Sequence, residues 1–299
     1  MHSSLLLLTG LIAVVWRWRW RWRFSCGDAT RSPAGPWQTR WQSALVAFCL
    51  PPLMILLAAG AVLSMGHHGT MMGWSVSPLG CWVSLGALGF VGGIVAHTLS
   101  RAAQTQLRLR PYPTVTLPTG DYARCLEIDL PVAAQVGLWH SSLLVSRGWL
   151  EQLTMAEQQA MVAHEQAHAD YRDPLWFLGL GMIRRFSMGL PNTQALWEEL
   201  LLLREIRADQ RAASTSDPLL LAELLVKLSR QMTLATQGYS SDIEPSVGFN
   251  ESLSPSRLEQ RVNALLEPDS VAETAVPAPG RLMWLMVALL PLAATWLHS

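Results

Sequence analysis

The sequence contains few charged residues, and their charges cancel. Only 15% of the 299 residues are charged, with 22 basic side chains against 22 acidic ones. A chain without net positive charge lacks the electrostatic attraction that draws proteins to nucleic acid, so we expect no direct nucleic-acid partner. Half of the residues are hydrophobic instead, which favours a protein of the membrane.

Cysteine is also scarce. The chain has four cysteines whose positions show no paired spacing, namely Cys26, Cys49, Cys81 and Cys125. Disulfide frameworks and thiolate metal sites both need cysteines in pairs or clusters, so we expect neither. A metal ion in this protein would have to be held by other side chains.

Two features of a cleaved signal peptide are missing near the start of the chain. No lysine or arginine precedes the apolar run that begins at Leu5, and no small-x-small cleavage site follows it. We therefore expect the first apolar segment to remain part of the protein as a membrane anchor.

Long apolar segments are what the sequence does contain. Four of them approach the roughly 20 residues that a helix needs to cross a bilayer. They lie at residues 4–22, 44–64, 81–99 and 282–298. The sequence therefore predicts a membrane region at 1–100 with three transmembrane helices, a separate domain at 101–280, and a C-terminal transmembrane helix at 281–299.

The placement of arginine predicts the orientation in the membrane. The loop after the first segment is rich in arginine, whereas residues 65–80, between the second and third segments, contain no lysine or arginine. Arg101 follows the third segment and Arg281 precedes the fourth. By the positive-inside rule, both termini lie outside and residues 101–280 lie in the cytoplasm.

The first segment ends in an alternating run of tryptophan and arginine, from Trp16 to Arg23. Indole rings favour the headgroup region of a bilayer and guanidinium groups attract anionic lipid, so we expect an interfacial segment. A plain membrane anchor explains this run, and a lipid-sensing or antimicrobial-like role is the alternative.

A cluster of histidine and methionine lies in the predicted outside loop at residues 65–72. It contains Met65, His67, His68, Met71 and Met72. Imidazole and thioether ligands suit copper, but loops also collect such residues without any ligand. The sequence alone does not decide between these two interpretations.

The most specific pattern in the chain is His164-Glu165-Gln166-Ala167-His168. Residues four apart share one face of a helix, so His164 and His168 can offer two imidazole nitrogens to one metal ion. Glu165 lies beside the first of them, where it can act as general base without binding the metal itself. This is the minimal apparatus of a zinc peptidase. The alternative is a solvated amphipathic helix that carries two histidines by chance.

A catalytic zinc ion needs a third protein ligand, and Glu205 is the best candidate. Asp209 lies four residues further on, so it shares the helix face of Glu205, and we expect it to accept an N–H from a ligand histidine. Glu198 is interpreted as a surface charge of the same helix. Asp170 and Asp173 follow the second histidine too closely to join the metal, and we interpret them as helix-end groups or as partners of the ligands.

With these residues the chain resembles the glutamate-type zincins of bacterial membranes, and most closely the BlaR/MecR-type antirepressor metalloproteases. The segment Gly137–Ser146 is similar to the family's β-hairpin before the zinc helix, and Ser254–Val262 is similar to the arginine-bearing helix that closes the domain. The likeness covers about residues 100–265. His140 stands where the family pattern leads us to expect a proline or small residue. As a second departure, we expect no β-lactam-binding sensor after the last apolar segment.

The resemblance implies a multi-pass α-helical membrane protein with a cytoplasmic α+β zincin-type metalloprotease domain. It implies Zn²⁺ as the cofactor, with His164, His168 and Glu205 as ligands, Glu165 as the catalytic base and Asp209 as a partner of the ligands. The expected location is the bacterial inner (cell) membrane. The residues that bind the substrate are unknown, and His140 and Tyr171 are guesses for the group that stabilises the oxyanion.

Within the domain the sequence pattern is typical of a small α+β fold. Alternation of apolar and polar residues predicts a strand at 124–130 and a second β stretch at 134–146. We expect helices at about 154–171, 175–188, 193–213 and 218–236. Thr154 and Glu157 form a capping box that starts the first of them. Strand 142–146 is our candidate for pairing with a peptide substrate, and the alternative is that it only completes the sheet.

Three classes of function follow. The first is a zinc-dependent endopeptidase that cleaves a cytoplasmic transcriptional repressor or another membrane-associated regulator in signal transduction. The second is a housekeeping protease of the quality-control or CAAX type. The third is a non-catalytic zinc-binding receptor, although a structural site would need no Glu165. The expected partners are the lipid bilayer and a protein substrate, and the sequence leaves open whether a separate sensor protein takes part.

Overall fold

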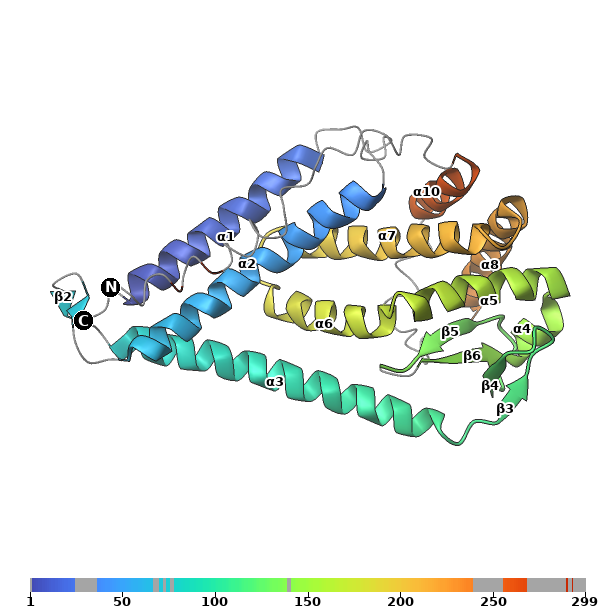
Figure 1. The fold of residues 1–299 in the computed structure, drawn as a ribbon, viewed down its shortest axis with the longest axis horizontal. Helices are drawn as coiled ribbons and strands as arrows, with labels where there is room; N and C mark the ends of the chain where they lie inside the picture. The colour runs from blue at the N-terminus through green and yellow to red at the C-terminus, as the bar shows by residue number, and fades with distance from the viewer. Residues whose placement is uncertain are drawn as a thin grey trace. The chain divides into compact units, whose positions relative to one another are not determined.

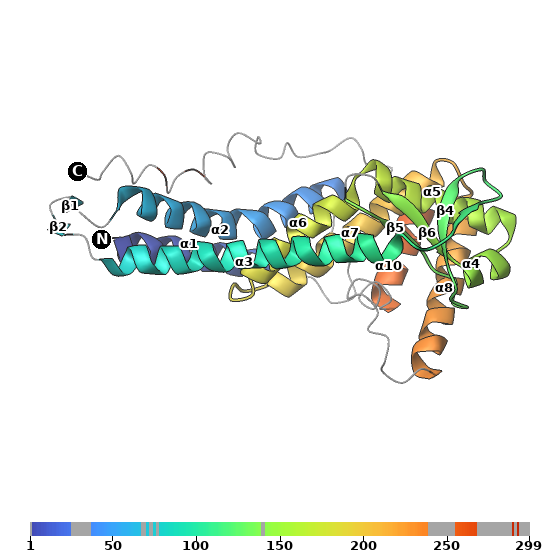
Figure 2. The ribbon, with the colours of Figure 1, turned by 90° about the horizontal axis from the view of Figure 1, so that it is seen from below.

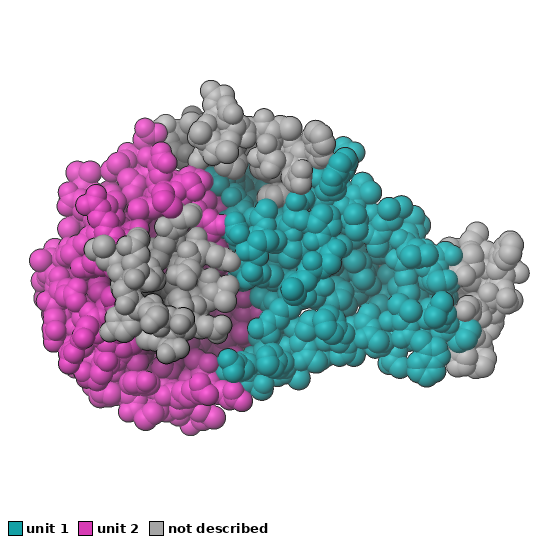
Figure 3. All heavy atoms as spheres, turned by 180° about the vertical axis from the view of Figure 1, so that it is seen from behind, with its two compact units in different colours: residues 1–101, 180–199, 273–299 teal, residues 102–179, 200–272 magenta. Residues whose placement is uncertain are grey.

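The computed structural model describes residues 2–24, 37–66, 70–71, 74–75, 78–138, 141–238 and 255–267, together with residues 289 and 292. This part of the chain is mostly helical, with a small mixed sheet. The chain divides into two compact units, coloured separately in Figure 3. Unit 1 comprises Met1–Arg101, Leu180–Glu199 and Glu273–Ser299, and unit 2 comprises Ala102–Gly179 and Leu200–Ala272.

Long helices make up most of the described part of unit 1. Helix α1 (His2–Phe24) packs along α2 (Trp37–Met65), and the two lie side by side in Figure 1. A short antiparallel pair, β1 (Thr70–Met71) and β2 (Trp74–Ser75), precedes α3 (Pro78–Leu109). Unit 1 also receives the end of α6 (Asp173–Phe186) and the start of α7 (Thr193–Ala213).

Among the described helices, α2 and α3 are long and apolar enough to cross a membrane, judged by length and composition. They contain the predicted segments 44–64 and 81–99. Segment 4–22 is helical as α1, but its apolar stretch gives way to the arginine run at Arg17. Segment 282–298 lies outside the described residues except for Leu289 and Leu292. A four-span membrane protein therefore remains a prediction.

The start of the tryptophan–arginine run is not interfacial in the way we expected. Arg17 is fully buried, and its guanidinium donates to the backbone oxygen of Phe48 at 2.8 Å and to Oγ1 of Thr193 at 3.0 Å. That carbonyl is free because the residue four positions on is Pro52, which has no N–H to complete the helical hydrogen bond. Arg17 therefore stabilises α2 through a buried hydrogen bond. The sequence alone suggested that this side chain contacts lipid.

The sheet of unit 2 has four strands: β3 (Thr114–Thr116), β4 (Tyr122–Leu126), β5 (Ala133–Val136) and β6 (Ser142–Ser146). Their order is β3-β4-β6-β5, with β4 and β6 parallel and the other pairs antiparallel. The prediction that strand 142–146 receives a peptide is wrong, because β6 has a partner on each side. Strand β5 lies at the edge of the sheet instead.

The helices of unit 2 agree closely with the predicted ones. They are α4 (Arg147–Gln152), α5 (Met155–Asp170), the first half of α6, the rest of α7, α8 (Pro218–Gly238) and α10 (Pro255–Leu266). The capping box at Thr154 and Glu157 is present at the start of α5. Helix α5 ends at Asp170, and Arg172 adopts a positive φ of 54° before α6 begins.

Helix α5 lies against the edge strand β5, as the ribbon in Figure 2 shows. The core beneath it is formed by buried side chains of the sheet, α4 and α8, including Val145, Trp149, Leu221 and Leu224. Burial of these apolar side chains fixes the position of α5, because Ala160 on the same helix belongs to the core. The face of α5 that carries the two histidines is therefore held rigidly.

Candidate metal centre

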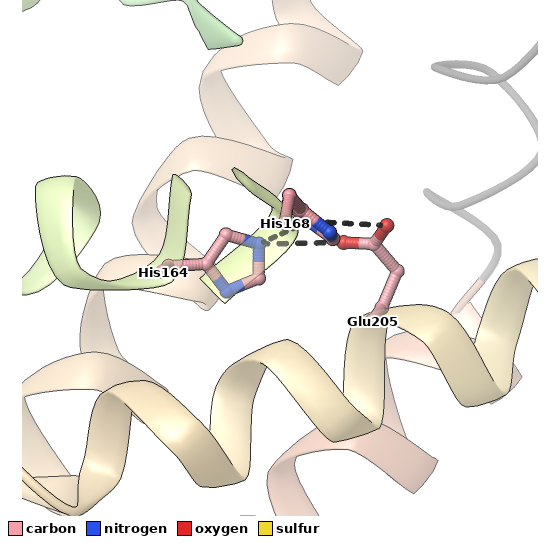
Figure 4. Close-up of side chains that lie close together, drawn as sticks. All are labelled: His164, His168 and Glu205. Atoms are coloured by element: carbon pink, nitrogen blue, oxygen red, sulfur yellow. Dashed lines mark hydrogen bonds and ion pairs between the residues drawn. The ribbon is translucent and has the colours of Figure 1, made fainter. Parts of the chain in front are cut away.

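Helix α5 supplies His164 and His168, and helix α7 supplies Glu205. Figure 4 shows the three side chains pointing into one space between the two helices. One ligand atom from each lies within 4.8 Å of the others. The two imidazole Nε2 atoms are 3.2 Å apart, and oxygens of Glu205 lie 3.5 Å from His164 Nε2 and 3.8 Å from His168 Nε2. The structure thus brings together the three residues that the sequence predicted as metal ligands.

The other nitrogen of each histidine contacts an aspartate. His168 Nδ1 lies 2.7 Å from Oδ2 of Asp173, and His164 Nδ1 lies 2.9 Å from Oδ1 of Asp209, although at an angle less than ideal for a hydrogen bond. An ionised carboxylate can only accept hydrogen bonds, so we assign the proton of each ring to Nδ1. Each Nε2 then carries a bare lone pair that faces its neighbour.

This arrangement fits a metal ion well. Two imidazole lone pairs and the carboxylate of Glu205 converge, and acceptors that face one another at these distances repel unless a cation or a proton lies between them. Imidazole and carboxylate together are the ligand set of catalytic zinc sites, in which further carboxylates accept hydrogen bonds from the ligand histidines. All three side chains are buried, so the surrounding protein would limit the access of bulk water to a bound ion.

The acids of the cluster are paired with arginines. Arg261 from α10 donates to both oxygens of Asp209, at 2.7 and 2.8 Å. Arg207 forms an ion pair with Asp173. Arg204 donates from Nε and Nη2 to Oε1 of Glu205, at 2.9 and 2.6 Å.

The arginines lower the pKa values of Glu205 and Asp209. Burial would raise the pKa of Glu205, but Arg204 and Arg261 hold this pKa well below its ordinary value. Burial opposes the ionisation of Asp209 too, and Arg261 outweighs that effect and lowers the pKa of its carboxyl. Both groups are therefore ionised at neutral pH.

Glu165 differs from the other acids of the cluster. Among the described residues no arginine forms an ion pair with it, and its one hydrogen bond is accepted from the backbone N–H of Gln135 on β5, at 2.9 Å. Burial raises the pKa of Glu165, an effect that the nearby histidines reduce and Glu205 reinforces. A buried carboxylate with a raised pKa beside paired carboxylates with lowered pKa values is the pattern of a general base among supporting groups.

His164 responds to the same charges in the metal-free protein. Burial would lower its pKa, but the contacts with Asp209 and Glu205 outweigh burial and raise the pKa of His164 to about 10. A proton therefore occupies the space between the Nε2 atoms and Glu205 when no metal ion is bound. Metal and proton compete for the same lone pairs.

The other sequence predictions have mixed outcomes. Asp209 and Asp173 contact the histidines, as expected of partners of the ligands. Glu198 lies away from the cluster and accepts a hydrogen bond from Gln194. The ring of Tyr171 lies 4.0 Å from the guanidinium of Arg207, at the end of α5, which agrees with a helix-end role. His140 and the histidines of the 65–72 loop lie outside the described residues.

Several residues of the cluster were not predicted from the sequence. Arg204 and Arg207 lie close to Glu205 in the same helix, and this proximity could have suggested them. Their partners, however, depend on how α7 packs against α5 and α6. Arg261 lies on the helix that the resemblance singled out. Gln135 gave no signal, because it contributes its backbone rather than its side chain.

No family model, no characterised protein and no solved structure matches the chain. The resemblance to the BlaR/MecR-type proteases therefore remains a prediction that rests on the motifs.

Proposed function

We propose that this chain is a zinc-dependent endopeptidase of the membrane. The observation that carries the proposal is the convergence of His164, His168 and Glu205 next to a buried carboxylate, Glu165, which forms no ion pair with an arginine in the described part of the chain. A site that only stabilised the fold would need no such carboxylate. The alternative of two chance histidines on a solvated helix does not account for the buried aspartate that contacts each of them.

The residues of the cluster have separate tasks in this mechanism. A zinc ion held by His164, His168 and Glu205 would polarise a peptide carbonyl and acidify a water molecule. Glu165 accepts the proton of the attacking water and then delivers it to the leaving amine. Asp209 and Asp173 orient the two imidazoles, and Arg261 keeps the carboxyl of Asp209 ionised.

Strand β5 is the edge of the sheet that we propose for binding a peptide substrate. Gln135 directs its N–H towards Glu165, so its backbone faces away from β6 and towards the candidate metal centre. An extended peptide that adds to β5 as a further strand would place its backbone beside Glu165. This replaces β6 by β5 as the strand that binds substrate.

The apolar helices support a location in the bilayer. Only 11% of the most apolar window of α3 is buried, and exposed side chains such as Trp82, Leu85 and Phe90 cover the helix. A helix of this length and composition is stabilised by lipid on its exposed side. With residues 101–280 in the cytoplasm, as arginine placement predicts, the substrate would be a cytoplasmic regulator such as a transcriptional repressor.

The test is proteolysis by the purified, zinc-loaded full chain in detergent, with a library of proteome-derived peptides as the probe and mass spectrometry as the readout. We expect cleavage within peptides by the wild type and none by Glu165→Gln, which should still bind zinc. Glu205→Ala should lose both zinc and activity. Cleavage by Glu165→Gln would overturn the mechanism. A wild type that binds zinc but cleaves nothing would favour the zinc-binding receptor, and cleavage of many unrelated sequences would favour the quality-control protease.

A further inference from the structure

The three arginines of the candidate metal centre are not equivalent. The side chains of Arg261 and Arg207 are 10% and 13% exposed, and each is engaged by a buried aspartate. The side chain of Arg204 is 26% exposed. It is therefore the most accessible cation next to the three predicted ligands within the described part of the chain.

One nitrogen of the Arg204 guanidinium, Nη1, donates no hydrogen bond to a described residue. The Nε and Nη2 atoms both donate to the same oxygen of Glu205. The guanidinium also lies 4.8 Å from the centre of the ring of Phe177, which fixes its plane. A planar guanidinium held at two nitrogens and against an aromatic ring keeps its third nitrogen in a defined position.

Peptide hydrolysis is accelerated by such a hydrogen-bond donor. When water attacks the carbonyl carbon, the π electrons of the C=O bond move onto the oxygen, which becomes an oxyanion. Donors that are already in place when this charge develops stabilise the transition state more than the substrate. The two histidines are predicted ligands of the metal ion, so this donor has to come from another side chain.

We propose that Arg204 is a catalytic residue that donates from Nη1 to the carbonyl oxygen of the scissile peptide as that oxygen becomes negative. The inference rests on the proposed endopeptidase function. Arg204 transfers no proton in this step: Glu165 takes the proton of the water and passes it to the amine nitrogen when the C–N bond breaks. The electron pair on the oxyanion then restores the C=O bond.

A purely structural role for Arg204 makes a different prediction. If its hydrogen bonds to Glu205 only orient that ligand, then removing Arg204 would weaken zinc binding, and every zinc-dependent property would fall in proportion. If Arg204 stabilises the oxyanion, zinc affinity would change little while affinity for an oxyanion mimic would fall sharply. Arg204→Lys keeps a positive charge near Glu205 but lacks the second and third nitrogens.

The experiment therefore compares wild type, Arg204→Lys and Arg204→Met as full chains in detergent. Arg211→Lys is the matched control, because Arg211 lies on the same helix with a 59% exposed side chain and a 3.8 Å contact to Asp170. Two affinities are measured: zinc, by chelator competition, and a phosphinic analogue of a peptide that the wild type cleaves, whose tetrahedral oxygens mimic the oxyanion. The KM and kcat for that peptide are recorded alongside.

We expect Arg204→Lys to bind zinc within about threefold of wild type, and to lose about 100-fold in phosphinate affinity and in kcat, with KM nearly unchanged. Arg211→Lys should behave as wild type. Unchanged phosphinate affinity in Arg204→Lys, or a loss no larger than its loss of zinc affinity, would overturn the proposal and make Arg204 a positioning residue. If the lysine variant fails to fold, Arg204→Met is used instead, and only a loss of phosphinate affinity larger than its loss of zinc affinity supports the proposal. If the wild type neither binds zinc nor cleaves peptides, the proposed function fails first, and the two failures are thereby distinguished.

Discussion

In the proposed mechanism, Glu165 creates a conflict between stability and function within a single side chain. It is 6% exposed and has one hydrogen bond, from a backbone N–H, whereas the other acids of the cluster have arginine partners. Burying a carboxylate with so little compensation costs folding free energy at neutral pH. Functional sites often retain such groups because the chemistry needs them.

This conflict predicts that Glu165→Gln stabilises the metal-free protein at neutral pH. Glu165 has a pKa above the ordinary value of 4.5, so between these two values the folded chain binds a proton that the unfolded chain has released. Stability therefore falls as the pH rises through this window, and the penalty is complete above the raised pKa. Glutamine cannot ionise and can still accept from Gln135.

The measurement is thermal unfolding of wild type and Glu165→Gln, both stripped of metal, from pH 4 to pH 8. The variant should melt at a higher temperature at pH 8, and the difference should shrink towards pH 4. A difference that does not depend on pH would mean that ionisation of Glu165 is not the cause.

His164 gives a second prediction at the same scale, concerning metal uptake. Its pKa of about 10 means that the metal-free site carries a proton at pH 8, which zinc must displace. Raising the pH towards that value removes the competitor, so apparent zinc affinity should increase by about tenfold per pH unit between pH 7 and pH 9. Calorimetry at pH 8 in buffers of different ionisation enthalpy should show about one proton released per zinc ion. Zinc uptake without proton release would contradict the assigned protonation.

The candidate metal ligands were predictable from the sequence, but most of the residues that contact them were not. Helical periodicity places His164 and His168 on one face, and the same rule places Glu205 next to Asp209. The partner of Arg204 or Arg207 is set by the packing of helices that are distant in sequence, and periodicity carries no information on this packing. A backbone donor such as that of Gln135 leaves no trace in the sequence at all.

At the scale of elements, the chain is tightly packed at the corner between β6 and α4. The hydroxyl of Ser146 accepts from the backbone N–H groups of Trp149 and Val132, at 3.0 and 2.9 Å. Gly148 approaches the backbone so closely that an added Cβ would lie 1.9 Å from the carbonyl oxygen of Asp129. This corner sets the direction in which the chain leaves the sheet towards α5.

We therefore predict that Gly148→Ala destabilises the fold by about 3 kcal/mol or more, because the clash is with backbone rather than with a flexible side chain. Gly179→Ala is the matched control: this glycine lies inside α6 with open space around it, and alanine should add about 0.5 to 1 kcal/mol of stability. Chemical or thermal unfolding of the two variants measures both effects. Equal stability in the two variants would refute the described approach of Gly148 to Asp129.

The elements themselves were predicted better than their arrangement. Helices α5, α7 and α8 begin within two residues of the expected positions, since caps and prolines mark their ends. The single β stretch at 134–146 proved to be two strands, β5 and β6, with β6 inside the sheet. Alternation of side chains reports which face of a strand is buried, and the order of strands depends on pairings between distant segments. The three-residue strand β3 is too short to give a pattern.

At the scale of the whole molecule, the membrane topology makes a prediction that is independent of catalysis. In a chain whose four cysteines are replaced by serine, a single cysteine at Ser64, which is exposed near the end of α2, should react with an impermeant maleimide added to intact cells. A single cysteine at Ser214, which is exposed after α7, should react only after the cells are opened. This follows from the positive-inside rule. Labelling of the Ser214 position from outside would reverse the topology and exclude a cytoplasmic substrate.

The central claim is that one zinc ion is held by His164, His168 and Glu205, and the most direct test is the zinc content of the purified chain. Wild type, Glu205→Gln and Glu198→Gln are dialysed against a weak chelator and analysed by mass spectrometry of the metal. Glu198 lies two turns earlier on the same helix and outside the cluster, so it controls for the loss of a carboxylate. Wild type and Glu198→Gln should retain about one zinc ion per chain, and Glu205→Gln should retain almost none. Full zinc content in Glu205→Gln, or none in the wild type, would contradict the account.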